Sequence, residues 1–418
     1  MEDNNKQYLA SMTIMGALFF IFGFVTWVNG PLITFVKLAF DLDTDSKAFL
    51  VTTVFYLAYF FLALPSSWIL EKTGMKKGMA VGLITMAVGS FMFGHFTTAR
   101  NYTMSLVGLF IIGSGISLLQ TASNPYVSII GPIATAAKRI SIMGICNKVA
   151  GMLAPLIFGI LVLKDVDQFE TKVKAADPAT KELLLNEFAS SIYTPYLIMA
   201  ILLLIFAVWI TRSALPEIKT SDVNKAPAGA EGKNSIFQFA YLWLGALCIF
   251  VYVGAEVMAG DAIGTYGKGF NIPTDETKYF TTYTLIAMAV GYVLGLATIP
   301  KIISQAQALK ISAILGILFT FAAVLTHGYV SVVFVACLGL ANAMMWPSIW
   351  PLAIEGLGKF TEKGSALLIM GIAGGAIIPK VYASLKDDYD FQWTFFALTL
   401  PCYLYILFFA QKGHKIGR

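Results

Sequence analysis

GSGISLLQTASNPY, at residues 113–126, places glycines, amides and a proline inside a long apolar segment of the chain. A second stretch, GLANAMMWPSIWPL at residues 339–352, matches it at a constant offset that aligns Pro125 with Pro351 and Gln120 with Trp346. Two similar halves with polar helices at corresponding positions are typical of membrane carriers whose binding site lies between the halves. The repeat therefore predicts a pathway that the two halves share.

Twelve long apolar segments make up most of the chain, which is 57% hydrophobic and only 13% charged. About twenty apolar residues cross the hydrocarbon core of a bilayer, so each segment is long enough for one span. We therefore predict an all-α membrane protein with twelve transmembrane helices in two pseudo-symmetric six-helix bundles. The predicted spans lie near residues 9–39, 46–70, 77–96, 102–131, 139–163, 191–212, 236–267, 276–300, 309–327, 329–356, 362–385 and 391–411.

One segment has the composition of a linker. Residues 214–235, ALPEIKTSDVNKAPAGAEGKNS, are rich in Pro, Ala, Gly and charged residues and follow the sixth predicted span. They divide the chain into an N-terminal domain at 1–213 and a C-terminal domain at 236–418. A second polar loop, at 164–190, is expected to hold a short amphipathic helix around residues 179–188, next to Pro178.

Loop charges predict the orientation in the membrane. Lys and Arg gather on the side that carries both termini and the linker, whereas acids such as Asp41, Asp43 and Asp388 gather on the opposite side. Cytoplasmic loops carry the excess of Lys and Arg, so both termini are predicted to face the cytoplasm, in the inner (plasma) membrane of a bacterium. The net charge of +5 reflects this bias and does not indicate a nucleic-acid partner.

The sequence shows no pattern for enzymatic, metal or nucleotide chemistry. The three histidines lie far apart, the cysteines have no metal-ligand spacing, and no phosphate-binding GKS or GKT follows a glycine run. We therefore predict no catalytic site, no metal centre, no cofactor and no disulfide. The cysteines expected to act as buried thiols are Cys146, Cys248, Cys337 and Cys402.

The loop between the second and third spans reads SWILEKTGMKKG, at residues 67–78. It resembles the loop pattern Gly-x-x-x-Asp-Arg-x-Gly-x-Lys-Lys of the major facilitator superfamily, with Ser67 in place of the first glycine. Glu71, Lys72, Gly74 and Lys76 occupy the acidic, basic, turn and second basic positions. A carboxylate at a helix end can bind a neighbouring terminus and release it, so this loop is predicted to gate the pathway.

A closer resemblance is to the fucose:proton symporter family, which includes bacterial glucose/galactose-type carriers. FFIFGFVTWVNGPLI in the first span, the 113–126 stretch in the fourth and VYVGAEVMAGDAIGTYG in the seventh carry it, with MMWPSIWPLAIEGLG and GIAGGAIIPKVY in the tenth and eleventh. The resemblance implies two six-helix domains around a central cavity, lined mainly by the first, fourth, seventh and tenth spans.

Two departures from that family bear on coupling. Its fucose:proton members carry an aspartate where this chain has Gly30 and a glutamate where it has Gln120, and proton coupling and sugar contact are ascribed to those acids. A glutamine still donates and accepts hydrogen bonds, but it does not carry a proton. The sequence therefore predicts that coupling has moved elsewhere or has been lost.

Ionisable groups deep in a span are costly and usually functional or paired. Lys148 in the fifth span, with Glu256 and Asp261 in the seventh, are the predicted coupling residues. Either acid could bind a proton, contribute to a transient Na⁺ site or pair with Lys148. The alternative is a static ion pair that holds helices together. Five residues separate the two acids, about 140° around a helix, so they need not share a face.

Sugars need amides or carboxylates for their hydroxyls and aromatic rings for their C–H faces. The spans expected to line the cavity supply both kinds of side chain. Asn124–Pro125 is also expected to break the fourth span and expose carbonyls. The predicted substrate-binding residues are Asn29, Gln120, Asn124, Asn147 and Asn342, with Trp27, Tyr126, Tyr252 and Trp346.

The sequence thus predicts a secondary transporter that imports a monosaccharide, such as glucose, galactose, mannose or fucose, by cation symport through alternating access. Na⁺ is favoured over H⁺ because the family's proton-carrying positions are gone while oxygen-rich ones remain. An uncoupled sugar uniporter and an exporter of small apolar compounds are the alternatives. The expected partners are the sugar and the lipid bilayer, and one chain is expected to form a complete pathway.

Overall fold

The computed structural model describes residues 2–130, 136–213, 215–217 and 235–417. The first part of the chain forms α1 (Glu2–Trp27), α2 (Asn29–Ala39), α3 (Asp45–Ala48), α4 (Leu50–Thr73), α5 (Met75–Thr98), α6 (Tyr102–Ile129), α7 (Ala136–Leu161), α8 (Val166–Ala175), α9 (Pro178–Ser190) and α10 (Tyr193–Arg212). The second part forms α12 (Ala240–Gly260), α13 (Ile263–Lys268), α14 (Thr274–Thr277), α15 (Phe280–Thr298), α16 (Gln305–Leu325), α17 (Gly328–Asn342), α18 (Met345–Ile354), α19 (Thr361–Met370), α20 (Gly374–Leu385) and α21 (Phe391–Gln411). Short 3₁₀ helices are η2 (Ile236–Gln238), η3 (Gly358–Phe360), η4 (Gly371–Ala373) and η5 (Gly413–Lys415).

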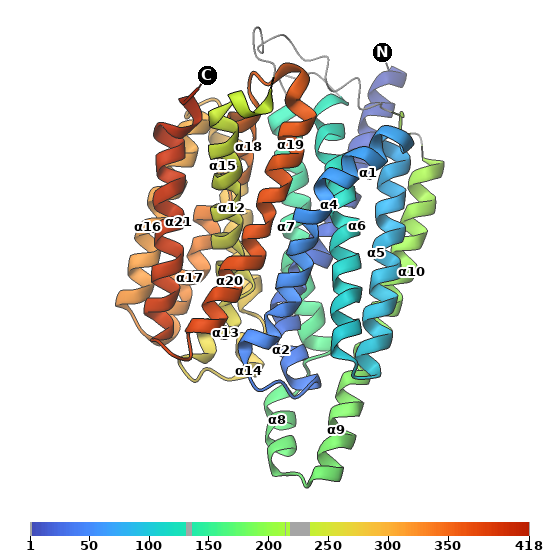
Figure 1. Cartoon of the computed structure of the whole chain (residues 1–418), viewed down its shortest axis with the longest axis vertical. Helices are drawn as coiled ribbons and strands as arrows, with labels where there is room; N and C mark the ends of the chain where they lie inside the picture. The colour runs from blue at the N-terminus through green and yellow to red at the C-terminus, as the bar shows by residue number, and fades with distance from the viewer. Residues whose placement is uncertain (1, 131–135, 214, 218–234, 418) are drawn as a thin grey trace.

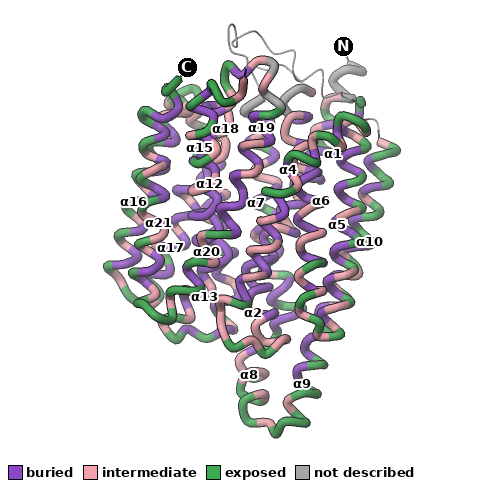
Figure 2. Tube along the Cα trace, viewed as in Figure 1, coloured by how far each residue is buried: buried purple, intermediate pink, exposed green. Residues whose placement is uncertain are grey.

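Among these residues, 12 helical segments are long and apolar enough to cross a membrane, which confirms the predicted spans and fold class. The first and second groups of helices stand side by side as two bundles, and both termini lie at the same end (Figure 1). We call this the terminal end. Apolar side chains such as Ile205, Leu318 and Leu325 are exposed. Exposed residues recur along the outer helices of the bundle, where lipid would cover them (Figure 2).

Several spans are interrupted, and the eleventh changes to a 3₁₀ helix at Gly371–Ala373. The first breaks at Val28, the seventh at Asp261 and Ala262, and the tenth between Asn342 and Met345. By contrast, α6 continues through Pro125, so the predicted break of the fourth span is wrong. Neighbouring helices can satisfy the carbonyl that a helix-interior proline leaves without its donor.

The 214–235 linker falls almost entirely outside the described residues, so the division at 213 and 236 stays a proposal. The loop at 164–190 holds two helices, α8 and α9, which project beyond the bundle at the end opposite the termini (Figure 1). Asp177 caps α9, because its side chain accepts from the backbone N–H groups of Ala179 and Thr180 at 3.0 and 3.2 Å. We call the end of the bundle from which α8 and α9 project the hairpin end.

Polar contacts join the two halves at the hairpin end. Asp167 accepts from the backbone N–H groups of Thr274 and Asp275 at 3.0 Å, and Asp275 accepts in return from those of Val166 and Asp167 at 3.3 Å. Each carboxylate therefore caps the helix start that carries the other. Lys278 adds a hydrogen bond of 2.7 Å to the carbonyl of Leu163.

A second group of contacts lies on the same end. Lys386 pairs with Asp45 at 2.6 Å, Lys380 donates to Ser46, and the hydroxyls of Ser46 and Ser384 lie 3.0 Å apart. Both groups connect the first half to the second. The structure is therefore closed at the hairpin end.

Candidate functional site

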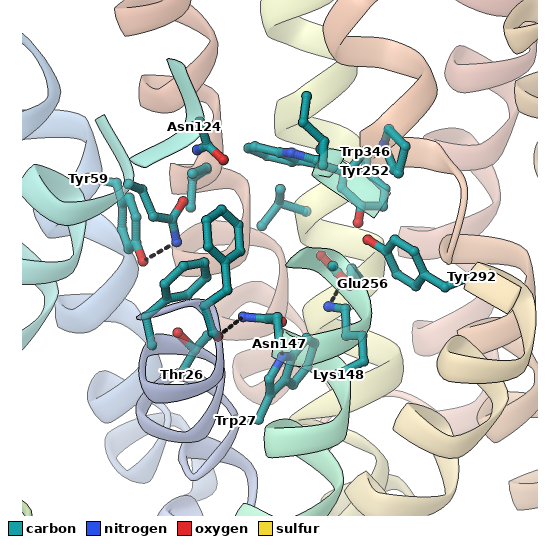
Figure 3. Close-up of a pocket in the computed structure, with 18 of the residues that line it drawn as sticks. Thr26, Trp27, Tyr59, Asn124, Asn147, Lys148, Tyr252, Glu256, Tyr292 and Trp346 are labelled. Carbon is teal, nitrogen blue, oxygen red and sulfur yellow. Dashed lines mark hydrogen bonds and ion pairs between the residues drawn. The ribbon is translucent and has the colours of Figure 1, made fainter. Parts of the chain in front are cut away.

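A cavity of about 120 Å³ lies between the two halves, near the middle of the bundle. Helices of both halves contribute to it, and Figure 3 shows their side chains converging on one space. A smaller space, lined by Asn124, Trp346 and Trp350, adjoins it. The lining residues are Phe19, Phe22, Thr26, Trp27, Tyr56, Tyr59, Gln120, Asn124, Ile140, Gly144, Asn147, Lys148, Tyr252, Val253, Glu256, Tyr292, Trp346, Pro347 and Ile372.

An ion pair crosses this cavity. The Lys148 ammonium of α7 lies 2.9 Å from the Glu256 carboxylate of α12, and both side chains are about nine-tenths buried. The same ammonium lies 4.3 Å from the ring centroid of Trp27, a favourable position for a cation over an aromatic face. Of the pairings that the sequence left open for Lys148, the structure shows the one with Glu256.

Trp27 is the last residue of α1 and stands where the first span breaks. Its ring packs on two glycines: a Cβ at Gly151 or Gly260 would lie 2.6 or 2.5 Å from ring atoms. Its indole N–H points to the side-chain oxygen of Asn147, 3.4 Å away. Because Gly260 belongs to the second half, Trp27 is a direct contact between the halves.

The amides and aromatic rings around the cavity suit a polyol. Gln120 donates to the Tyr59 hydroxyl at 3.2 Å and keeps its carbonyl oxygen for another partner. The rings of Tyr252 and Trp346 have centroids 6.4 Å apart, and Trp346 stacks on Trp350 at 5.3 Å. Such a wall offers flat apolar faces beside hydrogen-bonding groups.

Sequence reasoning missed several lining residues. Tyr56 and Tyr59 of α4 and Tyr292 of α15 face the cavity, although the second and eighth spans were not expected to line it. Thr26 also lines it, just before the break in the first span. The spacing of Tyr56 and Tyr59, three residues apart, puts them on one helix face and is a signal that the sequence did contain.

Three predicted substrate-binding residues do not line the cavity. Asn29 is two residues beyond Trp27, which turns it about 200° around a helix, and it is buried on α2. The Tyr126 hydroxyl donates to the carbonyl of Pro216 at 2.9 Å, and Asn342 accepts from the Tyr403 hydroxyl at 3.1 Å. The side chains of Tyr126 and Asn342 are directed toward these neighbours. None of the three lines this cavity, and their role in substrate binding stays a prediction.

Asp261 does not line the cavity either. It follows the last residue of α12 and is 2% exposed, as the angle between it and Glu256 allows.

Among the described residues, no group of three or more His, Cys, Asp or Glu side chains is arranged to hold a metal ion. All four cysteines are free; Cys248 and Cys402 are buried, whereas Cys146 and Cys337 are only half-buried.

At the predicted gating loop, the acid that binds the start of α5 is Glu217 and not Glu71. Gly74 has a φ of 75°, which favours glycine, and it ends α4 as the turn glycine should. Lys76 donates its backbone N–H to Glu217 at 3.2 Å and its ammonium to the Ser213 carbonyl at 2.8 Å. Glu217, just after the sixth span, thus occupies the start of α5.

The other two predicted gate residues are more exposed. Lys72 places its ammonium 3.7 Å from the ring centroid of Trp68. Glu71 has no hydrogen-bond or ion-pair partner within the part of the chain that the structure describes, and it is exposed. A gating role for the loop therefore remains a prediction.

Comparisons with known proteins agree with this architecture. The family model described as Major Facilitator Superfamily matches residues 15–379. A glucose/galactose transporter of Brucella abortus is 33% identical over 421 residues, covering 99% of this chain and 96% of that protein. The L-fucose-proton symporter of Escherichia coli is 26% identical over 413 residues, covering 97% and 94%. A crystal structure of the transporter FucP in the outward conformation has the same fold, with a TM-score of 0.78 at 23% identity over 97% of this chain and 99% of that one.

The chain belongs to the major facilitator superfamily, as its loop pattern and span count predicted. The relatives that it matches are transporters, which agrees with the prediction that it is not an enzyme. It is a multi-pass membrane protein whose cavity lies between its halves.

Proposed function

We propose that this protein imports a monosaccharide by cation symport through alternating access. The sugar binds in the cavity between the halves, where Gln120, Asn124 and Asn147 meet its hydroxyls and Trp27 and Trp346 meet its apolar faces. The observation that carries the proposal is a polar, aromatic cavity crossed by the buried Lys148–Glu256 pair. The relatives named as glucose/galactose and fucose transporters support the same substrate class.

The Lys148–Glu256 pair gives the cavity a way to respond to its occupant. A sugar hydroxyl that hydrogen-bonds to Glu256 competes with Lys148 for the carboxylate. Such competition changes the relative free energies of the two facing states, and only a ligand with differential affinity can shift that equilibrium. The pair therefore links sugar occupancy to rocking of the halves.

The loop charges support an orientation with the terminal end in the cytoplasm and the hairpin end outside. In this orientation the structure is closed to the outside. We place the protein in the plasma membrane of a bacterium, working as a single chain.

The residues that line the cavity also bear on the two alternative functions, an exporter of apolar compounds and an uncoupled uniporter. An exporter of apolar compounds would need a lining without the amides and the ion pair seen here. An uncoupled uniporter would have no use for the ionisable residues Lys148, Glu256 and Asp261, which are costly to place in a span.

Binding of hexoses should be visible in the fluorescence of the purified protein, because Trp27 and Trp346 line the cavity. Gln120→Leu removes a hydrogen-bonding group and should weaken binding roughly five- to tenfold, since one such bond contributes about 1 kcal/mol. Gln411→Leu, at an exposed position on α21, is the matched control and should bind as the wild type does. If glucose, galactose, mannose and fucose all leave the fluorescence unchanged, the proposed substrate class is wrong.

A further inference from the structure

Asp261 is a buried acid that follows the last residue of α12. It follows Gly260, the residue of the second half on which the Trp27 ring packs. Neither of its carboxylate oxygens has a hydrogen-bond partner within the part of the chain that the structure describes. The nearby ammonium of Lys148 is already 2.9 Å from Glu256, so it does not neutralise Asp261 directly. The carboxyl group therefore lies at the contact between the halves, and none of the described residues forms an ion pair with it.

Three titratable groups lie around Asp261. Glu256 of the same helix, Lys148 of α7 and Tyr56 of α4 are near enough to interact with it electrostatically. Glu256 and Lys148 bind each other. Toward the hairpin end, Lys37 of α2 pairs with Asp45, and Lys380 of α20 binds Ser46.

A bound Na⁺ would need several oxygen ligands around the carboxylate, as other hard cations do. The backbone oxygens closest in sequence each accept one hydrogen bond already, so each has only one lone pair left to offer a cation. The carbonyl of Gly260 accepts from the Thr281 hydroxyl and that of Ala259 from the Thr284 hydroxyl, both at 2.8 Å. An ionised carboxylate without partners is strongly disfavoured in such a place, and such a group takes up a proton instead.

We infer that Asp261 is the proton-binding site of this transporter and that it must be protonated before the hairpin end can close. The inference rests on the proposed function and names its coupling ion. With the hairpin end open, the carboxylate takes one proton from outside water and becomes a neutral carboxylic acid. With the terminal end open, the acid gives up that proton, which passes to water on the terminal side, and Asp261 becomes an anion again. The Lys148–Glu256 pair then responds to the sugar, and Asp261 responds to the ion.

Infrared spectroscopy of the purified protein tests the neutral acid without any sugar. At pH 7 the wild type should show the C=O stretch of a protonated carboxyl group, and Asp261→Asn should lose it. Glu256→Gln should keep the band, as should Asp388→Asn, the matched control at an exposed position. Absence of the band from the wild type, or equal amplitude in Asp261→Asn, would overturn the inference.

Transport in proteoliposomes tests the coupling. A pH gradient, acidic outside, should drive hexose accumulation by the wild type, whereas Asp261→Asn should only equilibrate the sugar while keeping exchange of labelled for unlabelled hexose. Accumulation that depends on Na⁺ alone, or that persists in Asp261→Asn, contradicts the inference. If no hexose crosses at all, the proposed function fails, and the infrared result still decides whether Asp261 holds a proton.

Discussion

Glu256→Gln should destabilise the protein and uncouple it, because it leaves the Lys148 ammonium buried without its carboxylate. Breaking a buried ion pair from one side costs about 3–5 kcal/mol. Lys148→Met should cost a similar amount for the same reason. The double variant Lys148→Met with Glu256→Gln should recover much of the loss, since neither charge is then left alone. Thermal unfolding of the four proteins in detergent gives the coupling between the two positions.

Transport separates a coupling role from a merely structural one. Glu256→Gln should abolish accumulation against a gradient and retain hexose exchange across the membrane. The double variant should regain stability without regaining accumulation. Asp43→Asn is the control for the exposed Lys47–Asp43 pair and should change neither stability nor transport measurably. Unimpaired accumulation by Glu256→Gln would remove the pair from the coupling mechanism.

Trp27→Ala should both destabilise the protein and weaken closure at the hairpin end. The ring touches Gly151 and Gly260 in the two halves, and it lies over Lys148. Replacing a buried Trp by Ala costs roughly 3–5 kcal/mol and leaves a cavity. Because the lost contact joins the halves, the variant should also close less completely at the hairpin end. The distance between a label on the protruding α8–α9 hairpin and a label on the α14 loop can report this closure.

Two further variants define what the Trp27 ring contributes. Trp27→Phe keeps an aromatic face for Lys148 but loses the indole N–H directed at Asn147, so it should bind sugar more weakly while closing nearly as the wild type does. Trp393→Ala, at an exposed position, should behave as the wild type. Unchanged closure and binding in Trp27→Ala would contradict the role given to this contact.

The spans could be predicted from the sequence because bilayer thickness sets their length and the long apolar runs contain few charged residues. The pairing of Lys148 with Glu256 was one of few options, since a buried charge needs a partner. Which face of each helix meets the cavity was harder to predict. The break at Val28 turns Asn29 away from Trp27, and Asn342 is directed at Tyr403 instead of the cavity.

Other features depend on contacts between distant parts of the chain. Glu217 binds at the start of α5 although no loop pattern contains it. The sequence favours Na⁺ because the family's proton-carrying acids are replaced at Gly30 and Gln120. The packing around Asp261 leads us to H⁺ instead, since only the structure shows that its oxygens have no hydrogen-bond partner among the described residues.

Uptake of labelled hexoses into proteoliposomes is the most direct test of the central claim, which is that the cavity between the halves carries a sugar against its gradient. A pH gradient and a Na⁺ gradient should be imposed separately on vesicles with the wild-type protein and on empty vesicles. We expect accumulation of at least one hexose, driven by the pH gradient, in vesicles with the protein alone. Uptake no faster than in empty vesicles, for every hexose and either gradient, would contradict the account.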